Sequence, residues 1–520
     1  MQKRFDTYSS SSHRTPTKLN MIVITGICLI VAISALMLFE SKHSSQGILF
    51  GFGSLFVVFL YFLFLKQWRW GIYGLIAYMP FSGLPGILFY SSIGSGRASL
   101  IKDFLFVIPA YLGFTFWYLK NRKQTRLDFP GSPLILMVVL AGLLFFHFLA
   151  IMPTNLMVGL IGLKVWLFYM PLFFLGYHLI DSKTQLIRLA KLMLILGMIP
   201  VIFGIVQAGL IYSGNQSIAF MLHGPAANAS TQGFALFLEA GGVGLSRVPG
   251  LFTFVSQYFL FLLCLLPIAC ATWLSADQSR RHMPLYTIVL TLVVIAAFTC
   301  GARAAYMLIP GYFGVIVIMD RRFRHLFKYL VAFMVVIPIG FNFLLWLIGT
   351  SRNTFLEFAS DVILGYLSPS SEYSLIYQFK DALKMTWSGL GTGMATGSSR
   401  FAFQEYGIPA SAGAISGIEA FYAKTIVEIG VPGLIIVVAI FTRLIFSGWI
   451  NLKEIKESSL RAFSVSLLAF LILIVIYLLK GAAIDYDPLN VYFWFFAGIL
   501  MKLPTLDLSK RADVVYGLQQ

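Results

Sequence analysis

Long apolar runs alternate with short polar segments along most of the chain. A helix that crosses the hydrocarbon core of a bilayer needs about 20 mostly apolar residues. By that measure the pattern predicts fourteen membrane spans, and the fold class is an all-α integral membrane protein. We expect the spans at 21–39, 47–65, 71–90, 104–118, 133–151, 159–180, 191–212, 251–274, 284–300, 304–319, 329–348, 420–448, 462–479 and 490–501.

Composition agrees with this pattern. Hydrophobic residues make up 58% of the 520 residues and charged residues only 11%, and the mean hydropathy is +0.84. Soluble domains carry about 25% charged residues, so the chain has too little polar surface to cover a soluble globule. A soluble enzyme, a soluble nucleic-acid-binding domain and a disordered regulator are therefore excluded.

The net charge of +17 follows membrane orientation. With the N-terminus in the cytoplasm, the inner segments hold 25 of the 38 basic residues, and the outer segments hold 11 when the last large one is counted as 349–424. Cytoplasmic loops are generally enriched in Lys and Arg. We therefore expect cytoplasmic tails at 1–20 and 502–520, membrane regions at 21–348 and 420–501, and no nucleic-acid partner.

Two outer segments are unusually long, 213–250 and 349–419. Loops longer than about 15 residues are commonly functional or disordered. The second segment has helical patterning at 354–367 and 373–387, which predicts a large, partly helical extracytoplasmic loop.

Several kinds of chemistry lack a motif. The chain has no GxxxxGK[ST], HExxH or GxSxG sequence, and its seven histidines are not spaced like metal ligands. The four cysteines lie in apolar runs and form no CxxC pair. We therefore expect neither a metal nor a cofactor.

Polar motifs remain on the outer side. CGARAAY places Arg303 in a tight turn between two spans, and RVPGLF places Arg247 just before another span. Arginine at a membrane boundary is often functional. An interfacial arginine that reaches the headgroups is the alternative interpretation of Arg303 and, taken alone, the preferred one for Arg247.

A glycine-rich turn and a carboxylate follow later in the chain. GLGTG at 389–393 lies in the large outer loop, where a tight turn is the default interpretation. Glu419 lies at the outer end of a span, eleven residues before the first glycine of Gly430-x-x-Gly433. A carboxylate at the start of a helix also stabilises the helix dipole, so a structural role is the alternative. Glu428 lies deeper in the same helix and faces another direction.

In this order, the motifs resemble those of the O-antigen ligase and O-antigen polymerase superfamily over roughly residues 156–450. These are membrane glycosyltransferases with a GT-C architecture and a large outer loop. The ligases have a histidine at the position eleven residues before the GxxG pair. This chain has Glu419 followed by Ala420 there, which favours a polymerase over a ligase.

The resemblance implies transfer or polymerisation of a glycan from an undecaprenyl pyrophosphate carrier on the outer face of the bacterial cytoplasmic membrane, without a metal. The acceptor would be a glycan or a lipid-linked glycan. Membrane lipids are implied partners. A chain-length regulator or export proteins are further partners that the resemblance allows.

Site roles follow from the same resemblance. Arginine binds phosphate oxygens with two parallel hydrogen bonds, so Arg303 is the first choice for the leaving group, followed by Arg247 and Arg400. Glu419 would take the proton of the acceptor hydroxyl. The glycines expected to bind substrate are Gly389, Gly391 and Gly393.

A flippase for lipid-linked oligosaccharides, or another polysaccharide exporter, is the competing class. It would show two related halves and polar residues within the spans. The basic residues expected well inside spans are Lys164 and Arg443. A structural membrane protein, the third class, predicts no accessible cluster of Arg247, Arg303 and Glu419.

Overall fold

The computed structural model describes most of the chain from residue 58 onward. The described residues are 58–88, 90, 99–122, 125–152, 156–227, 236–240, 243–276, 282–320, 322–323, 339, 374–395 and 418–517. The expected span 21–39, nearly all of 329–348, the expected helix 354–367 and Arg400 lie outside these residues.

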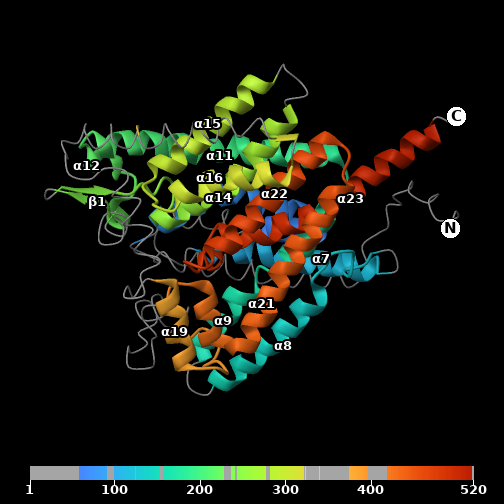
Figure 1. The fold of residues 1–520 in the computed structure, drawn as a ribbon, viewed down its shortest axis with the longest axis horizontal. Coiled ribbons are helices and arrows are strands. Elements are labelled where there is room, and N and C mark those ends of the chain that lie inside the picture. Colours follow the sequence, from blue (N-terminus) through green and yellow to red (C-terminus); the bar gives the residue numbers. More distant parts are fainter. Residues whose placement is uncertain are drawn as a thin grey trace, which may run out of the picture.

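Helices make up most of the described chain (Figure 1). Those before residue 230 are α3 (Trp68–Tyr78), η1 (Met79–Phe81), α4 (Leu84–Leu88), the π-helical η2 (Asp103–Val107), α7 (Ile108–Lys120), α8 (Leu134–Ile151), α9 (Leu156–Leu167), α10 (Leu172–Leu179), α11 (Lys183–Tyr212), α12 (Gln216–Ala219) and η3 (Gly224–Ala226). Those after it are α14 (Val255–Ala276), α15 (Met283–Thr299), α16 (Ala305–Met319), α19 (Leu375–Met385), α21 (Phe421–Glu454), α22 (Ser458–Tyr477), η8 (Ala483–Asp485) and α23 (Leu489–Gly517).

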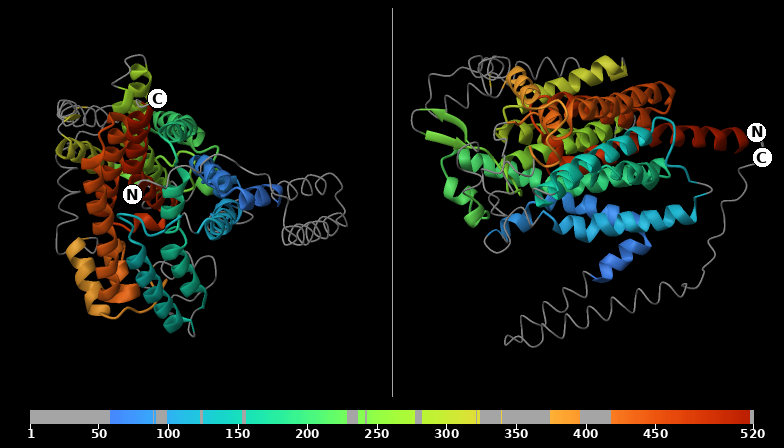
Figure 2. Two further views of the ribbon diagram at one scale, coloured as in Figure 1. Left: turned by 90° about the vertical axis from the view of Figure 1, so that its right-hand side faces the viewer. Right: turned by 90° about the horizontal axis from the view of Figure 1, so that it is seen from below.

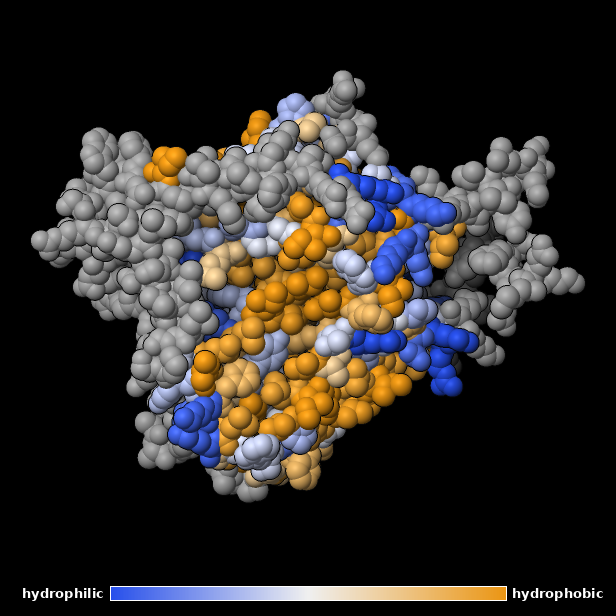
Figure 3. Space-filling view, in the orientation of Figure 1, coloured by the Kyte–Doolittle hydropathy of each residue, from blue (hydrophilic) through white to orange (hydrophobic). Residues whose placement is uncertain are grey.

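The helices confirm a multi-pass membrane protein. Within the described ranges, seven helical segments are long and apolar enough to cross a bilayer, and α15 and α16 are shorter apolar helices. A broad hydrophobic band crosses the face in Figure 3, and hydrophilic side chains gather over α19 and towards the end where α23 projects. The full number of fourteen spans stays a prediction.

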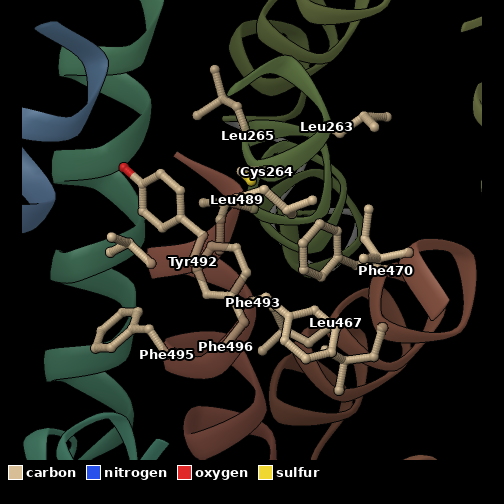
Figure 4. Close-up of a cluster of buried hydrophobic side chains, with 14 of the residues drawn as sticks. Leu263, Cys264, Leu265, Leu467, Phe470, Leu489, Tyr492, Phe493, Phe495 and Phe496 are labelled. Atoms are coloured by element: carbon tan, nitrogen blue, oxygen red, sulfur yellow. The ribbon is translucent and has the colours of Figure 1, made fainter. Parts of the chain in front are cut away.

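The long helices lie side by side in the view from below (Figure 2). At their centre α14, α22 and α23 pack through large apolar side chains (Figure 4). Phe496 of α23 contacts Phe470 of α22 edge-on at 5.6 Å and stacks with Tyr492 at 5.3 Å between ring centroids. Because lipid tails are as apolar as these side chains, the contacts between membrane helices stabilise the bundle through close van der Waals packing.

A small hairpin departs from the all-helical expectation. Strands β1 (Leu236–Ala240) and β2 (Val243–Ser246) pair antiparallel within the outer segment 213–250. In Figure 2 the hairpin and α19 lie at the same end of the bundle, opposite the end of α23. Two segments predicted to share the outer side of the membrane are therefore at one end of the molecule.

Two expected spans are broken. The span predicted at 159–180 consists of α9 and α10, which are separated by a non-helical segment that includes Pro171. The span predicted at 420–448 falls in α21, which is interrupted at Gly430 (φ +72°, ψ −178°). That backbone conformation is accessible to glycine and not to other residues, so Gly430 divides α21 into Phe421–Ile429 and a longer second part.

Candidate functional site

The two arginine motifs lie against each other. Arg247 belongs to the loop between β2 and α14, and Arg303 belongs to the turn between α15 and α16. The N–H of Val248 donates to the carbonyl of Cys300 at 3.0 Å, which joins the loop to the turn. Both motifs therefore occupy the positions expected from the sequence, and their backbones are in direct contact.

A buried glutamine side chain forms a hydrogen bond with the backbone of the loop that contains Arg247. The side chain of Gln207, in α11, accepts a hydrogen bond from the N–H of Gly250 at 2.9 Å. Its amide nitrogen donates to the carbonyl of Ala219 at 2.9 Å. Because Gln207 is buried, these bonds satisfy polar groups that would otherwise be costly to bury.

The segment of Glu419 lies against the end of α22. The N–H of Phe421 donates to the carbonyl of Leu478 at 3.1 Å, and the hydroxyl of Tyr422 donates to the carbonyl of Val475 at 2.9 Å. These bonds place Glu419 beside the turn that contains Lys480.

Lys480 interacts with both arginine motifs and with Glu419. Its pKa is lowered to about 8, mainly by burial; Glu419 acts in the opposite direction, and the positive charges of Arg247 and Arg303 lower the pKa further. Glu419, Arg247 and Arg303 are therefore each within electrostatic range of Lys480. Arg303 is exposed, and the other three are half-buried, so the cluster is accessible from outside the bundle.

Helix ends add to the positive potential of the cluster. Helices α16 and α21 begin at Ala305 and Phe421, two residues after Arg303 and Glu419 respectively, whereas α14 begins eight residues after Arg247. The ring of Phe259, near the start of α14, lies 6.4 Å from that of Tyr477 at the end of α22. Helix N-termini carry partial positive charge and favour anions. The arrangement suits a phosphate group.

Lys480 is the residue of this cluster that the sequence analysis does not identify. It follows the expected span 462–479 directly, where a lysine is typical of an interfacial anchor. Nothing in that position indicates that it meets two arginines from distant parts of the chain.

The GLGTG turn fills the break in α21. The N–H groups of Leu390 and Gly391 donate to the carbonyls of Val427 and Glu428 at 2.7 and 3.1 Å. The carbonyl of Trp387 accepts from Val431 at 3.0 Å, across Gly430. The turn therefore supplies hydrogen-bond partners that the interrupted helix loses.

Close packing explains the glycines of this turn. Gly389, Gly391 and Gly393 all have positive φ. A Cβ on Gly393 would lie 2.0 Å from the carbonyl oxygen of Val158 in α9, which is too close for any side chain. Their neighbours belong to α8, α9 and α21, away from Arg247 and Arg303. A substrate-binding role for these glycines stays a prediction, and the structure supplies a packing reason for them.

Glu428 is fully buried. It accepts hydrogen bonds from the Trp166 indole at 2.6 Å and from the Ala395 N–H at 3.1 Å. One turn earlier, Lys424 is 1% exposed and pairs with Asp485 at 2.6 Å. Its ammonium also lies 4.5 Å from the centre of the Trp166 ring.

A second ionic group lies deeper between the helices. The ammonium of Lys102 contacts Asp103 at 3.1 Å and Asp487 at 2.9 Å, and Lys164 contacts Asp103 at 2.8 Å. The hydroxyl of Tyr169, in the break between α9 and α10, accepts from Lys102 at 2.7 Å and donates to Asp103 at 2.8 Å.

Two buried lysines add to the basic residues expected inside spans. Arg443 is exposed on α21, whereas Lys102 and Lys424 are buried in ion pairs together with Lys164. A small cavity between the two ionic groups includes Asp485 and Asn490 in its lining. The sequence analysis missed these lysines because both lie close to the expected ends of spans, where exposed lysines are common.

No family model, curated protein or solved structure matches the chain. Within the described part of the chain, no group of three or more His, Cys, Asp or Glu side chains is arranged to hold a metal ion.

Proposed function

We propose that the protein transfers or polymerises a glycan carried on undecaprenyl pyrophosphate, at the outer face of the bacterial cytoplasmic membrane, without a metal. One observation carries the proposal: Arg247, Arg303 and Glu419 each lie within electrostatic range of Lys480, and backbone hydrogen bonds join the Arg247 loop to the Arg303 turn and the Glu419 segment to the end of α22. The order of the sequence motifs supports the same reaction. Both termini would then be cytoplasmic.

The cluster has the charges that this reaction needs. The oxygen of an acceptor hydroxyl forms a bond to the anomeric carbon of the donor, while the bond from that carbon to the phosphate oxygen breaks. The hydroxyl proton passes to the carboxylate of Glu419, and the electron pair of the broken bond leaves with the lipid pyrophosphate. The leaving group thus gains negative charge, which the two arginines and Lys480 stabilise as it develops.

The surroundings of the cluster suit a donor that stays in the bilayer. Nearby helices present apolar side chains outward, among them Ile195 and Ile202 of α11 and Ile435 of α21. The polyprenyl chain of the donor would remain beside such surfaces, while its pyrophosphate reaches the charged cluster at the end of the bundle.

Reconstitution in liposomes with a defined lipid-linked repeat unit tests the proposal. We expect a ladder of longer glycans if the protein is a polymerase, and a single addition to a supplied lipid acceptor if it is a ligase. An intact, correctly inserted protein that forms neither product with donors of several sugar compositions would contradict the proposal.

A flippase for lipid-linked oligosaccharides is the second candidate, and the buried ionic groups around Lys102 and Lys424 favour it. Charged residues within membrane spans often mark transport pathways. Against this, the described carboxylates Asp103, Asp485 and Asp487 are paired with lysines of the protein itself. Movement of a fluorescent lipid-linked sugar between leaflets, without any change in glycan length, would support the flippase.

A further inference from the structure

The start of α21 depends on a side chain from another helix. Ala420, which precedes the first turn, has no side chain that accepts a hydrogen bond from the helix. The first N–H groups of a helix need partners from elsewhere. Gln378 of α19 supplies an acceptor to the two residues that precede the helix. Its Oε1 accepts from the N–H of Glu419 at 3.0 Å and from the N–H of Ala420 at 2.7 Å.

Gln378 is held firmly in this position. It is 3% exposed. The start of α19 is capped separately, by a hydrogen bond from the N–H of Tyr377 to the hydroxyl of Ser374 at 3.1 Å. Fully buried Ala382 packs in a small apolar cluster with Ala423 and Val427 of α21. Small side chains on both helices allow their backbones to approach closely.

The outer-loop segment that contains Gln378 also contacts the C-terminal end of Phe421–Ile429, the first part of α21. Residues 387–391 form backbone hydrogen bonds on both sides of Gly430. Because the positive-φ backbone of Gly430 interrupts the helix, the second part of α21 does not fix the direction of Phe421–Ile429 by helical continuity. The outer-loop segment 374–395 therefore contacts both ends of Phe421–Ile429, the helical part of α21 that follows Glu419.

We propose that Gln378 is a positioning residue that sets the orientation of the Glu419 carboxylate, so that the large outer loop controls the geometry of proton removal. The inference rests on the proposed function. A displacement of about 1 Å in a reacting group costs ~100-fold in rate. Side chains that lock a reacting group in place are therefore as necessary as the group itself.

Three variants test this role. Gln378→Met keeps the length of the side chain but removes both acceptor contacts, and we expect single-turnover transfer to fall by ~100-fold with donor affinity unchanged. Gln378→Glu keeps an oxygen at the same place and should recover most of the rate. Ser374→Ala weakens the cap of α19 without touching Glu419 and should leave the rate within about threefold, because a lost cap costs only ~1 kcal/mol of local stability.

Hydrogen exchange at the amides of Glu419 and Ala420 separates this inference from the proposed function, because it needs no substrate. Exchange should accelerate in Gln378→Met and stay at the wild-type rate in Ser374→Ala. If the wild type transfers no glycan, the proposed function fails, and the exchange rates still test the contact. Wild-type transfer by Gln378→Met, or an equal loss in Ser374→Ala, would overturn the positioning role.

Discussion

Replacing Lys480 with arginine should remove a pH dependence that the wild-type protein shows above about pH 8. A lysine carries its charge below its pKa, so its contribution to phosphate binding is present below pH 8 and is lost as the pH rises through that value. Arginine stays charged throughout this range. The variant should therefore keep its donor binding at pH 9, where the wild type loses it.

The magnitude follows from the lowered pKa of Lys480, about 8. About a tenth of the Lys480 side chains are neutral at pH 7 and about nine-tenths at pH 9, because one pH unit is a tenfold change in the protonation ratio. One preorganised contact to developing charge is typically worth ~2.7–4 kcal/mol. We therefore expect kcat/KM for the donor to fall by about tenfold between pH 7 and pH 9.

The assay is kcat/KM for the lipid-linked donor from pH 6.5 to 9.5, which reports protonation in the free enzyme. Lys480→Met serves as the second variant and should be slow at every pH, with no fall above pH 8. A wild-type profile that stays flat to pH 9.5 would refute this reasoning. So would a Lys480→Arg profile that falls at the same pH as the wild type.

Other predictions address the arginines, the packing and the orientation. Arg303→Lys should lose ~100- to 1,000-fold in transfer rate because one ammonium cannot bind two phosphate oxygens in parallel, whereas Arg322→Lys at the opposite end should match the wild type in the same assay. Gly393→Ala should lower the free energy of unfolding in detergent by at least about 2 kcal/mol, because its Cβ would meet Val158. Gly209→Ala, in helix α11 with open space around it, should not lower that free energy. A cysteine at position 213 should react with an impermeant maleimide in intact cells and one at position 458 should not; the reverse pattern would invert the topology.

Hydropathy predicted much of the helical architecture because it measures the property that a bilayer selects. The described helices α8, α11, α14 and α22 correspond to expected spans, and α19 to the expected helix at 373–387. The breaks at Pro171 and Gly430 were not predicted, because an interrupted span is as apolar as a continuous one. Only the partner segments that fill the breaks show where they occur.

The candidate site was predictable in part. Arg247, Arg303 and Glu419 stand out because each is a charged residue next to an expected span, on the side that the charge distribution predicts to be outer. Their proximity depends on how α14, α16, α21 and α22 pack, which one sequence does not reveal. Lys480 and Gln378 could not be identified for the same reason, since their roles depend on contacts with residues far away in the chain.

Single-turnover transfer by Glu419→Gln, measured together with donor binding, tests the central claim most directly. The amide keeps the shape of the carboxylate but cannot accept a proton, and general-base catalysis is typically worth ~100- to 10,000-fold. We predict a fall in transfer rate of that order with donor binding intact, and partial recovery in Glu419→His. Transfer by Glu419→Gln at the wild-type rate would contradict the account and leave Glu419 as a residue that only stabilises the start of α21.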